Sequence, residues 1–447
     1  MPECWAMIVG LVQRLLPKGR FARHFTILSG GATLGQAAVI ASSPLLTRLY
    51  GPEEFGVFSV FSAVAAILSQ VSALRYEAAV PVCRREEDAA AVALAGAVSA
   101  LLLTCLTALL IGLLEQPLAA ALGIPGHGAV LWLMPPLLLT WGLSLVLGHW
   151  SIRHSRFRVN AVSNMALSGS QAVGQVVLGW LSGTVMALVV GWVLGSVVRC
   201  VMLLRALPAP DLALFRRISL ARVVAEGRRQ WHYPAYSGSS ALLQSMAQML
   251  PAVLIAILYG PAAAGWFGLG QRITGMPTRM VSEAAAQAYL GEIGRAEGSA
   301  IHALFKRTVV RFFLVGAVGL APLLLAGPAL FAFVFGEPWR QTGTIVQLLV
   351  PLHLARFVVL PVAQTLNVVG RQHYHLIASL LTAAALLLAF ALAAWLDLSL
   401  MEMLLLYSLG STATFLYYLA CAWSAARAAA EGHRASPAQA EEETASL

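Results

Sequence analysis

Two stretches of this sequence, Leu49-Tyr50-Gly51-Pro52 and Leu258-Tyr259-Gly260-Pro261, repeat the same four residues 209 positions apart. In each copy a glycine and a phenylalanine follow at the same spacing: Gly56 and Phe58 in the first, Gly265 and Phe267 in the second. Each copy joins two long apolar runs, and the offset is nearly half of the 447 residues. Both copies enter the turn in the same direction, so the sequence predicts two parallel structural repeats related by an axis along the membrane normal.

The composition indicates a polytopic membrane protein. Hydrophobic residues make up 59% of the chain and charged residues only 11%, whereas a soluble domain carries about 25% charged residues. So few charges cannot cover a soluble body of this size. A secreted enzyme, a cytosolic catalyst and a disordered chain are therefore excluded.

The apolar runs predict an all-α polytopic membrane protein with twelve transmembrane helices, since each run is long enough to supply the roughly 20 residues that cross a bilayer. The expected spans are residues 25–48, 55–80, 89–114, 129–150, 159–181, 185–207, 233–258, 264–290, 309–334, 342–366, 376–396 and 400–425. With the repeat, they give two six-helix lobes.

The positions of the basic residues predict the orientation. With the N-terminus inside, the cytoplasmic segments hold 20 of the 29 basic residues and the external loops hold only Arg340. This bias predicts that both termini are cytoplasmic.

The expected organisation has five parts. Residues 1–24 form an amphipathic cytoplasmic segment, 25–207 the first lobe, 208–232 a basic cytoplasmic linker, 233–425 the second lobe, and 426–447 a disordered tail. Pro44 and Pro251 occupy matching helices of the two lobes and are expected to act as hinges, because proline removes a backbone donor and bends a helix. Membrane helices also tolerate proline without such a role.

The first hairpin carries a family resemblance. The run from Ser43 to Ser59, the segment Leu74-Arg75-Tyr76-Glu77-Ala78-Ala79-Val80 and the acidic Glu86-Glu87-Asp88 loop resemble the polysaccharide flippases of the Wzx type. These flippases, which carry O-antigen or exopolysaccharide units, belong to the multidrug/oligosaccharidyl-lipid/polysaccharide (MOP) exporter superfamily. The resemblance implies a MATE/MOP-like fold with a central cavity. It also implies transfer of an undecaprenyl-pyrophosphate-linked oligosaccharide from the inner to the outer leaflet of the bacterial inner membrane.

Translocating a charged glycolipid requires a polar interior on otherwise apolar helices. One stripe of polar residues in the span 159–181 has helical spacing and predicts a hydrophilic cavity wall: Asn160, Asn164, Ser168, Gln171 and Gln175. The alternative interpretation is hydrogen bonding between helices, which such side chains commonly provide in membranes. Gln244 and Gln248 are further candidates for the cavity lining.

Deep arginines are the candidates for an anionic headgroup site. Arg272 and Arg279 follow one helix face roughly 12 and 22 Å below its outer end, and Glu283 completes an i, i+4 pair with Arg279. Arg356 has a planar fork that suits phosphate, and Arg199 lies at comparable depth. Arg48 and Arg75 near helix ends are weaker candidates, because an interfacial position explains them.

Three groups are candidates for proton coupling: Glu283, Glu77 and His353. Structural pairing for the carboxylates and a local hydrogen bond for the histidine are the alternatives.

The sequence predicts a transporter without a catalytic site, a metal or a cofactor, since no enzyme or phosphate-loop motif is found. Expected partners are a polyprenyl-pyrophosphate-linked glycan and membrane lipids, with a glycan polymerase and chain-length machinery as further candidates and no nucleic acid. A MATE-like multidrug/ion antiporter, a lipid II-type flippase and a polytopic glycan polymerase or ligase are the competing functions.

Overall fold

The computed structural model describes residues 35–296, 298–371 and 373–445, with side chains as far as residue 431. Within these residues every regular element is a helix. Nine helical stretches of the described part are long and apolar enough to cross a membrane. An all-α polytopic membrane protein is therefore confirmed, while the amphipathic segment expected at 1–24 lies outside the described residues.

Three of the twelve expected spans do not meet the same criteria, for identifiable reasons. The span 25–48 begins outside the described residues, and the span 159–181 carries the polar stripe that lowers its hydropathy. The span 264–290 is divided among α13 (Pro261–Gly270), a π-helical turn η4 (Gln271–Gly275) and α14 (Met276–Ile293). The count of twelve stays a prediction.

The described residues form two compact units that divide between Gly268 and Leu269. The repeat places a lobe boundary earlier, in the linker 208–232, so α12 (Ser239–Tyr259) and most of α13 belong by their contacts to the first unit. The reason is that α12 packs along α4 (Pro52–Ser69). The six-helix lobes of the repeat stay a prediction.

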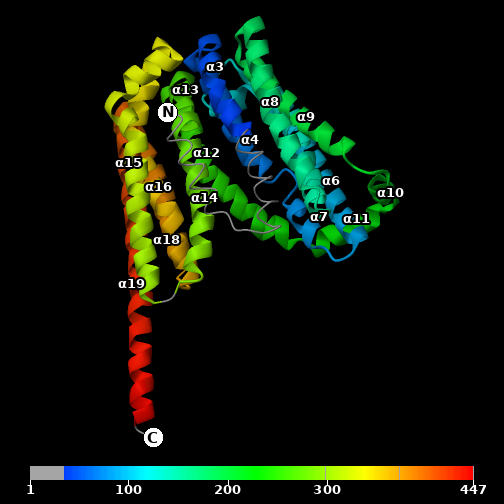
Figure 1. The fold of residues 1–447 in the computed structure, drawn as a ribbon. Helices are drawn as coiled ribbons and strands as arrows, with labels where there is room; N and C mark the ends of the chain where they lie inside the picture. Colours follow the sequence, from blue (N-terminus) through cyan, green and yellow to red (C-terminus); the bar gives the residue numbers. More distant parts are fainter. Residues whose placement is uncertain (1–34, 297, 372, 446–447) are drawn as a thin grey trace. The chain divides into compact units, whose positions relative to one another are not determined.

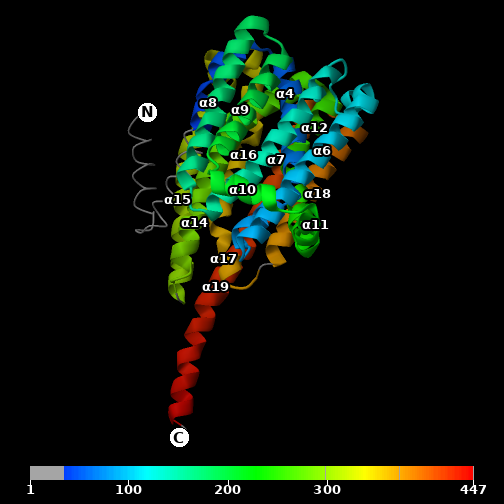
Figure 2. The ribbon, with the colours of Figure 1, turned by 90° about the vertical axis from the view of Figure 1, so that its right-hand side faces the viewer.

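The first unit is built around α4, which contacts α7, α9 and α12 (Figure 1). Figures 1 and 2 both show α8 and α9 running side by side. After a helical segment at 35–41, its elements are α3 (Ser43–Leu49), α4, α5 (Tyr76–Ala79), η1 (Val80–Val82), α6 (Glu86–Ala121), η2 (Gly128–Leu133), α7 (Met134–Arg153), α8 (Phe157–Ser182), α9 (Val185–Arg205), α10 (Ala209–Arg217), α11 (Leu220–Arg229), η3 (Tyr233–Gly238) and α12.

The repeated glycines pack against each other within this unit. A Cβ on Gly56 would lie 1.7 Å from the carbonyl oxygen of Pro261, and a Cβ on Gly265 would lie 1.9 Å from that of Pro52. Gly56 and Gly265 are equivalent positions of the repeat, as are Pro52 and Pro261. The contact is therefore reciprocal, and we call it the glycine seam.

The second unit is organised around α16 (Arg340–Val362), which packs on α14, α15 and α19. Its other elements are η4, α14, α15 (Ser299–Phe335), η5 (Glu337–Trp339), α17 (Gln364–Val368), α18 (His373–Trp395) and α19 (Leu400–Ala445). In both views α19 extends well beyond the other helices of its unit (Figures 1 and 2). Residues 426–445 are thus helical where a disordered tail was expected, because their alanines and glutamates have high helix propensity.

The third helices of the two repeats share a kink that the sequence analysis did not use. α6 leaves helical geometry at Leu114, three residues before Pro117, and α15 does so at Ala326, two residues before Pro328. These are also two of the longest helices, with 36 and 37 residues. Matching breaks at matching places support the parallel repeat.

One expectation about helix continuity needs correction, and the hinge role expected for two prolines stays a prediction. The span 55–80 is not one helix: α4 ends at Ser69, and Leu74 and Arg75 adopt left-handed backbone angles before α5. The two hinge prolines also differ. A turn at Ser42 interrupts the helix just before Pro44, whereas α12 runs through Pro251 without a break, since losing one hydrogen bond need not end a membrane helix.

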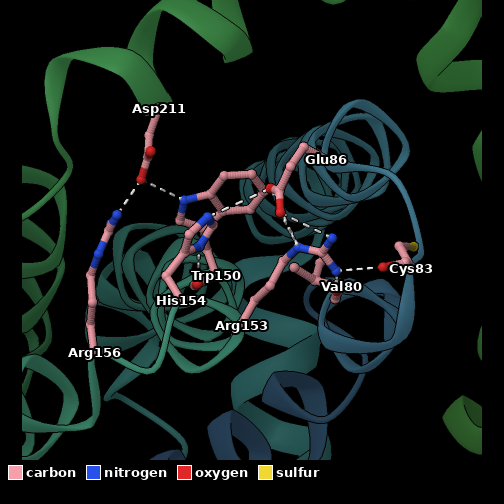
Figure 3. Close-up of polar contacts among 8 residues, drawn as sticks. All are labelled: Val80, Cys83, Glu86, Trp150, Arg153, His154, Arg156 and Asp211. Atoms are coloured by element: carbon pink, nitrogen blue, oxygen red, sulfur yellow. Dashed lines mark hydrogen bonds and ion pairs between the residues drawn. The ribbon is translucent and has the colours of Figure 1, made fainter.

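The linker 208–232 is docked onto the ends of α6, α7 and α8 by charged side chains (Figure 3). Asp211 of α10 accepts hydrogen bonds from Trp150 Nε1 at 3.0 Å and from Arg156 Nη1 at 2.8 Å. Figure 3 also shows Arg153 donating to the carbonyl oxygens of Val80 and Cys83 at 3.0 and 2.6 Å and pairing with Glu86 at 3.2 Å. α11 is held by Arg222, which pairs with Glu87 and Asp88.

The glycine seam predicts a size limit at two equivalent positions. Gly56→Ala and Gly265→Ala should each lower the stability of the purified protein by about 1–3 kcal/mol, because a Cβ forces two backbones apart. Thermal unfolding in detergent measures this loss. The control is Gly169→Ala in α8, where a Cβ meets nothing within 4 Å. Unfolding temperatures equal to the control's would show that the seam is not tightly packed.

The docking of α10 predicts a pH dependence. Burial alone would raise the pKa of Asp211, but the hydrogen bonds from Arg156 and Trp150 outweigh it and hold this pKa below its ordinary value of 3.8. A depressed pKa means that the stabilisation is full above the unfolded-state value and is lost as the pH falls through the folded-state value. Amide exchange in α10, measured relative to the intrinsic rate of unprotected amides at each pH, should therefore stay slow at neutral pH and accelerate below about pH 4.

The variant Asp211→Asn isolates this contribution. Removing a charge-assisted hydrogen bond costs about 1.5 kcal/mol, so exchange in α10 should be about tenfold faster at neutral pH. The acid-induced acceleration should also largely disappear. An exchange profile identical to that of the parent protein would contradict the assignment.

Candidate functional site

Five of the predicted charged or titratable residues lie on three elements of the second unit that pack on one another. Arg272 lies on η4, Arg279 and Glu283 on α14, and His353 and Arg356 on α16. η4 and α14 both pack on α16. Three arginines therefore share this region with one carboxylate, and we call these five residues the arginine cluster.

The i, i+4 pair expected on α14 is present. Arg279 Nε lies 3.5 Å from Glu283 Oε1, and the two side chains are 39% and 66% exposed within the structure. In a membrane protein such exposure means contact with lipid or with a water-filled space, and a charged pair is favoured only in the second.

The π-helical turn η4 places Arg272 and Thr274 against α16. The side chain of Arg272 is only 8% exposed, and Thr274 Oγ1 lies 3.3 Å from His353 Nε2. His353 is 3% exposed, so it has the buried, locally partnered environment that was the alternative to proton coupling. Single turns of π-helix are frequent at functional sites, because the extra residue re-aims the side chains around it.

Arg356 is the arginine whose environment best suits an anion. It lies close enough to Arg279, Glu283 and Tyr407 of α19 to interact with them electrostatically. Its Nε is buried and has no hydrogen-bond partner among the described residues. A buried donor without a partner calls for an explanation, and an absent ligand is one.

The polar stripe of α8 divides into two kinds of residue. Asn160 donates to the carbonyl oxygen of Gly148 at 2.8 Å, and Gln175 donates to that of Leu188 at 3.0 Å. Both are buried, and Ser168 lies where a Cβ on Gly35 would contact it. These three residues hold helices together. Asn164 and Gln171 are half-buried and stay candidates for a cavity wall.

Arg199 in the first unit lies over an aromatic group that the sequence analysis missed. Its guanidinium carbon is 6.0 Å from the ring centroid of Trp141, within cation–π range. Trp141 packs edge-on against Trp192, which also contacts Phe58 and Phe61. Three helices contribute these rings, so no local sequence pattern could have revealed the cluster.

Arg75 and Glu77 lie at the start of α5, directly after the irregular segment that follows α4. Arg75 Nη1 is 3.6 Å from Glu77 Oε1, and Arg75 Nε is 3.4 Å from Ser237 Oγ of the π-helical turn η3. Glu77 is 1% exposed, and its Oε2 has no partner in the described part of the chain. The left-handed backbone angles of Arg75 are strained for a residue with a side chain, and such strain clusters at functional sites.

The remaining candidates are placed less informatively. Arg48 is exposed in the last turn of α3, and Gln244 and Gln248 are exposed on α12. Of the residues that sequence reasoning missed, Thr274 and Tyr407 lie beside the arginine cluster. Neither a threonine nor a tyrosine stands out in a membrane helix without a known neighbour.

A family of proteins described as "Polysaccharide biosynthesis protein" matches residues 45–344 of this chain. The chain belongs to this family. The resemblance seen in the first hairpin is thereby confirmed. A curated relative is the "Succinoglycan biosynthesis transport protein ExoT" of Rhizobium meliloti (strain 1021), which is 26% identical over 335 residues. The alignment covers 73% of this chain and 64% of the relative, just under two thirds of its length.

Solved transporter structures share the fold of this family member. An inward-facing MATE family transporter of the MOP superfamily has a TM-score of 0.62 at 15% identity, covering 89% of this chain and 96% of its own. The lipid II flippase MurJ in an inward closed conformation has a TM-score of 0.64 at 11% identity, covering 88% and 87%. The expected MATE/MOP-like fold is confirmed.

The division of the α8 stripe predicts two different mutant phenotypes. Asn160→Ala should lower stability by about 1 kcal/mol or more, because it removes a buried hydrogen bond and leaves the Gly148 carbonyl without it. Asn164→Ala should leave the unfolding temperature within about 1 °C of the parent's, as surface-like substitutions usually do. Thermal unfolding of the two purified variants gives the comparison, and equal losses would contradict the division.

Proposed function

We propose that this protein is a flippase that moves an undecaprenyl-pyrophosphate-linked oligosaccharide, an O-antigen or exopolysaccharide repeat unit, from the inner to the outer leaflet by alternating access. The observation that carries the proposal is the arginine cluster, in which three arginines accompany a single carboxylate. Membership of the polysaccharide biosynthesis family supports a glycan cargo. The name of the Rhizobium relative, a succinoglycan transport protein, supports an exopolysaccharide unit.

The chemistry of the cargo explains why arginine is required. A pyrophosphate cannot enter hydrocarbon, so the protein must replace its hydration shell with donors and positive charge. The guanidinium group keeps its charge, presents five donors and matches phosphate oxygens in a bidentate fork. We assign Arg272, Arg279 and Arg356 to the headgroup. Arg199 and the half-buried Asn164 and Gln171 of the first unit stay candidates for contacts with the cargo.

The proposed setting is the bacterial cytoplasmic membrane, with both termini and the linker 208–232 in the cytoplasm. The excess of basic residues in the segments expected to be cytoplasmic supports this orientation. The membrane lipids and the lipid-linked glycan are the proposed partners, and a glycan polymerase with chain-length machinery would act on the delivered unit.

Two other transport functions make different predictions for the cargo. A multidrug antiporter of the same fold moves organic cations and would be expected to present carboxylates rather than an excess of arginines. A lipid II-type flippase shares the pyrophosphate, so only the glycan separates it from the proposal.

Flux in proteoliposomes tests the function. Vesicles containing the purified protein should expose a fluorescently labelled undecaprenyl-pyrophosphate oligosaccharide to an external glycan-modifying enzyme faster than empty vesicles do. An organic cation dye should not be transported. Transport of the dye without the glycolipid would overturn the proposal in favour of the antiporter.

Arginine substitutions test the assigned site. Arg356→Gln, Arg272→Gln and Arg279→Gln should each reduce glycolipid flux by roughly tenfold to a hundredfold, the cost of losing a hydrogen bond to a charged group. Arg356→Lys should recover only part of the flux, because it keeps the charge but not the fork. The control is Arg340→Gln in the same unit, an exposed residue paired with Glu337. If the three corresponding alanine variants, at normal expression, fully restored surface polysaccharide in a deletion strain, the assignment would fail.

A further inference from the structure

The linker helix α11 (Leu220–Arg229) and the turn after it carry large apolar side chains on their exposed surface, where a helix that faces water would carry polar ones. Leu220, Val224 and the following Trp231 are 72%, 46% and 56% exposed. The spacing of four residues places Leu220 and Val224 on one face of α11, and Trp231 lies in the turn that follows the helix. We call these three exposed side chains the apolar stripe.

Other residues of α11 hold the helix against the protein. Arg222 pairs with Glu87 and Asp88 at the start of α6. Val223 and Gly227 are buried, and Tyr76 donates its hydroxyl to the Gly227 carbonyl at 3.1 Å. The orientation of the apolar stripe is thus fixed, because ion pairs and close packing hold the helix in place.

α10 likewise has one residue that binds the protein and an apolar residue that is exposed. Asp211 faces the protein through Trp150 and Arg156, while Leu212 is 42% exposed. A hollow of about 360 Å³ lies along the outer face of α10, lined by Ala209, Leu212, Ala213, Arg216 and Arg217. Figure 2 shows α10 running across the neighbouring helices of its unit rather than along them.

The charges beside these apolar faces are positive. Arg216 and Arg217 are exposed at the hollow, and Arg228 and Arg229 are exposed on α11. Glu226, the acid that Arg229 contacts, is itself mostly covered, with 13% exposure. Apolar residues flanked by arginine are the composition of helices that lie in the headgroup region of a membrane, where the apolar side enters the acyl boundary and the arginines meet lipid phosphates.

We propose that α10 and α11 form a binding surface for anionic phospholipid, with the lipid phosphate held by Arg216 and Arg217 over the hollow of α10 and the acyl boundary covering Leu212, Leu220, Val224 and Trp231. Because the two helices are tied by ion pairs and a hydrogen bond to the ends of α6, α7 and α8, the bound lipid braces the ends of these spans. The surface is separate from the arginine cluster and from the proposed glycan cargo.

Lipid retention tests the headgroup site. The full-length protein, transferred from mixed nanodiscs and analysed by native mass spectrometry, should retain phosphatidylglycerol in preference to phosphatidylcholine. The double variant Arg216→Gln/Arg217→Gln should weaken phosphatidylglycerol association by roughly tenfold to thirtyfold, since each basic residue near an anionic surface contributes a factor of about five.

The matched control is Arg84→Gln/Arg85→Gln, which removes two exposed arginines from the loop before α6, without an adjoining apolar stripe. It should retain phosphatidylglycerol like the parent protein. Equal losses in the two double variants would show a general charge effect, and equal retention of the two lipids by the parent would show no headgroup preference. Either result overturns the proposal.

The apolar stripe has an independent test that does not depend on the arginine variants. A fluorophore on Leu220→Cys, in a background without other cysteines, should be quenched by nitroxide-bearing lipids and little affected by a soluble quencher. Efficient quenching by the soluble agent alone would overturn the proposal. Protection from both quenchers in native membranes, lost after purification, would do so in favour of a protein partner.

Discussion

The packing of the first unit depends on how closely two backbones approach at Gly56 and Gly265. Each glycine faces the proline carbonyl of the other copy of the repeat, at a distance that leaves no room for a side chain. Ser59 and Gly268, the next equivalent positions of the repeat, are packed just as closely, since a Cβ on Gly268 would lie 2.1 Å from Ser59 Oγ. Small residues at helix crossings let membrane helices gain van der Waals contact where the hydrophobic effect offers little. This contact is why α12 and α13 belong to the first unit although the repeat starts a new half before them.

The second constraint is the cost of charge in a bilayer. A charged side chain at the centre of a membrane is expensive and is retained where it has a function or a partner. The basic residues at the helix ends beside the linker 208–232 meet this constraint through Asp211, Glu86 and the pairs of Arg222 with Glu87 and Asp88. Among the described residues of the arginine cluster, Glu283 is the one carboxylate beside three arginines. In the proposed function, the excess positive charge faces an anionic cargo, and membership of the polysaccharide biosynthesis family supports the glycan attached to it.

Sequence reasoning recovered the parts of this protein that depend on periodicity and composition. The apolar runs predicted helices that the structure confirms, and the i, i+4 spacing predicted the contact of Arg279 with Glu283. It could not resolve features set by the approach of distant segments. The stripe of α8 has one spacing but two roles, because only Asn160 and Gln175 face carbonyl groups of neighbouring helices. The left-handed angles at Leu74 and Arg75 and the two π-helical turns likewise have no local sequence signal.

The central claim is that the interior of this protein is matched to the negative charge of its cargo. The most direct measurement is the affinity of the purified protein, in neutral nanodiscs, for one oligosaccharide linked to undecaprenol through a pyrophosphate, a monophosphate or an uncharged ether. Affinity should fall at each step of this series, by roughly tenfold or more for each lost contact with a charged group. The differences should also shrink in Arg356→Gln. Equal affinities for the three lipids would contradict the account.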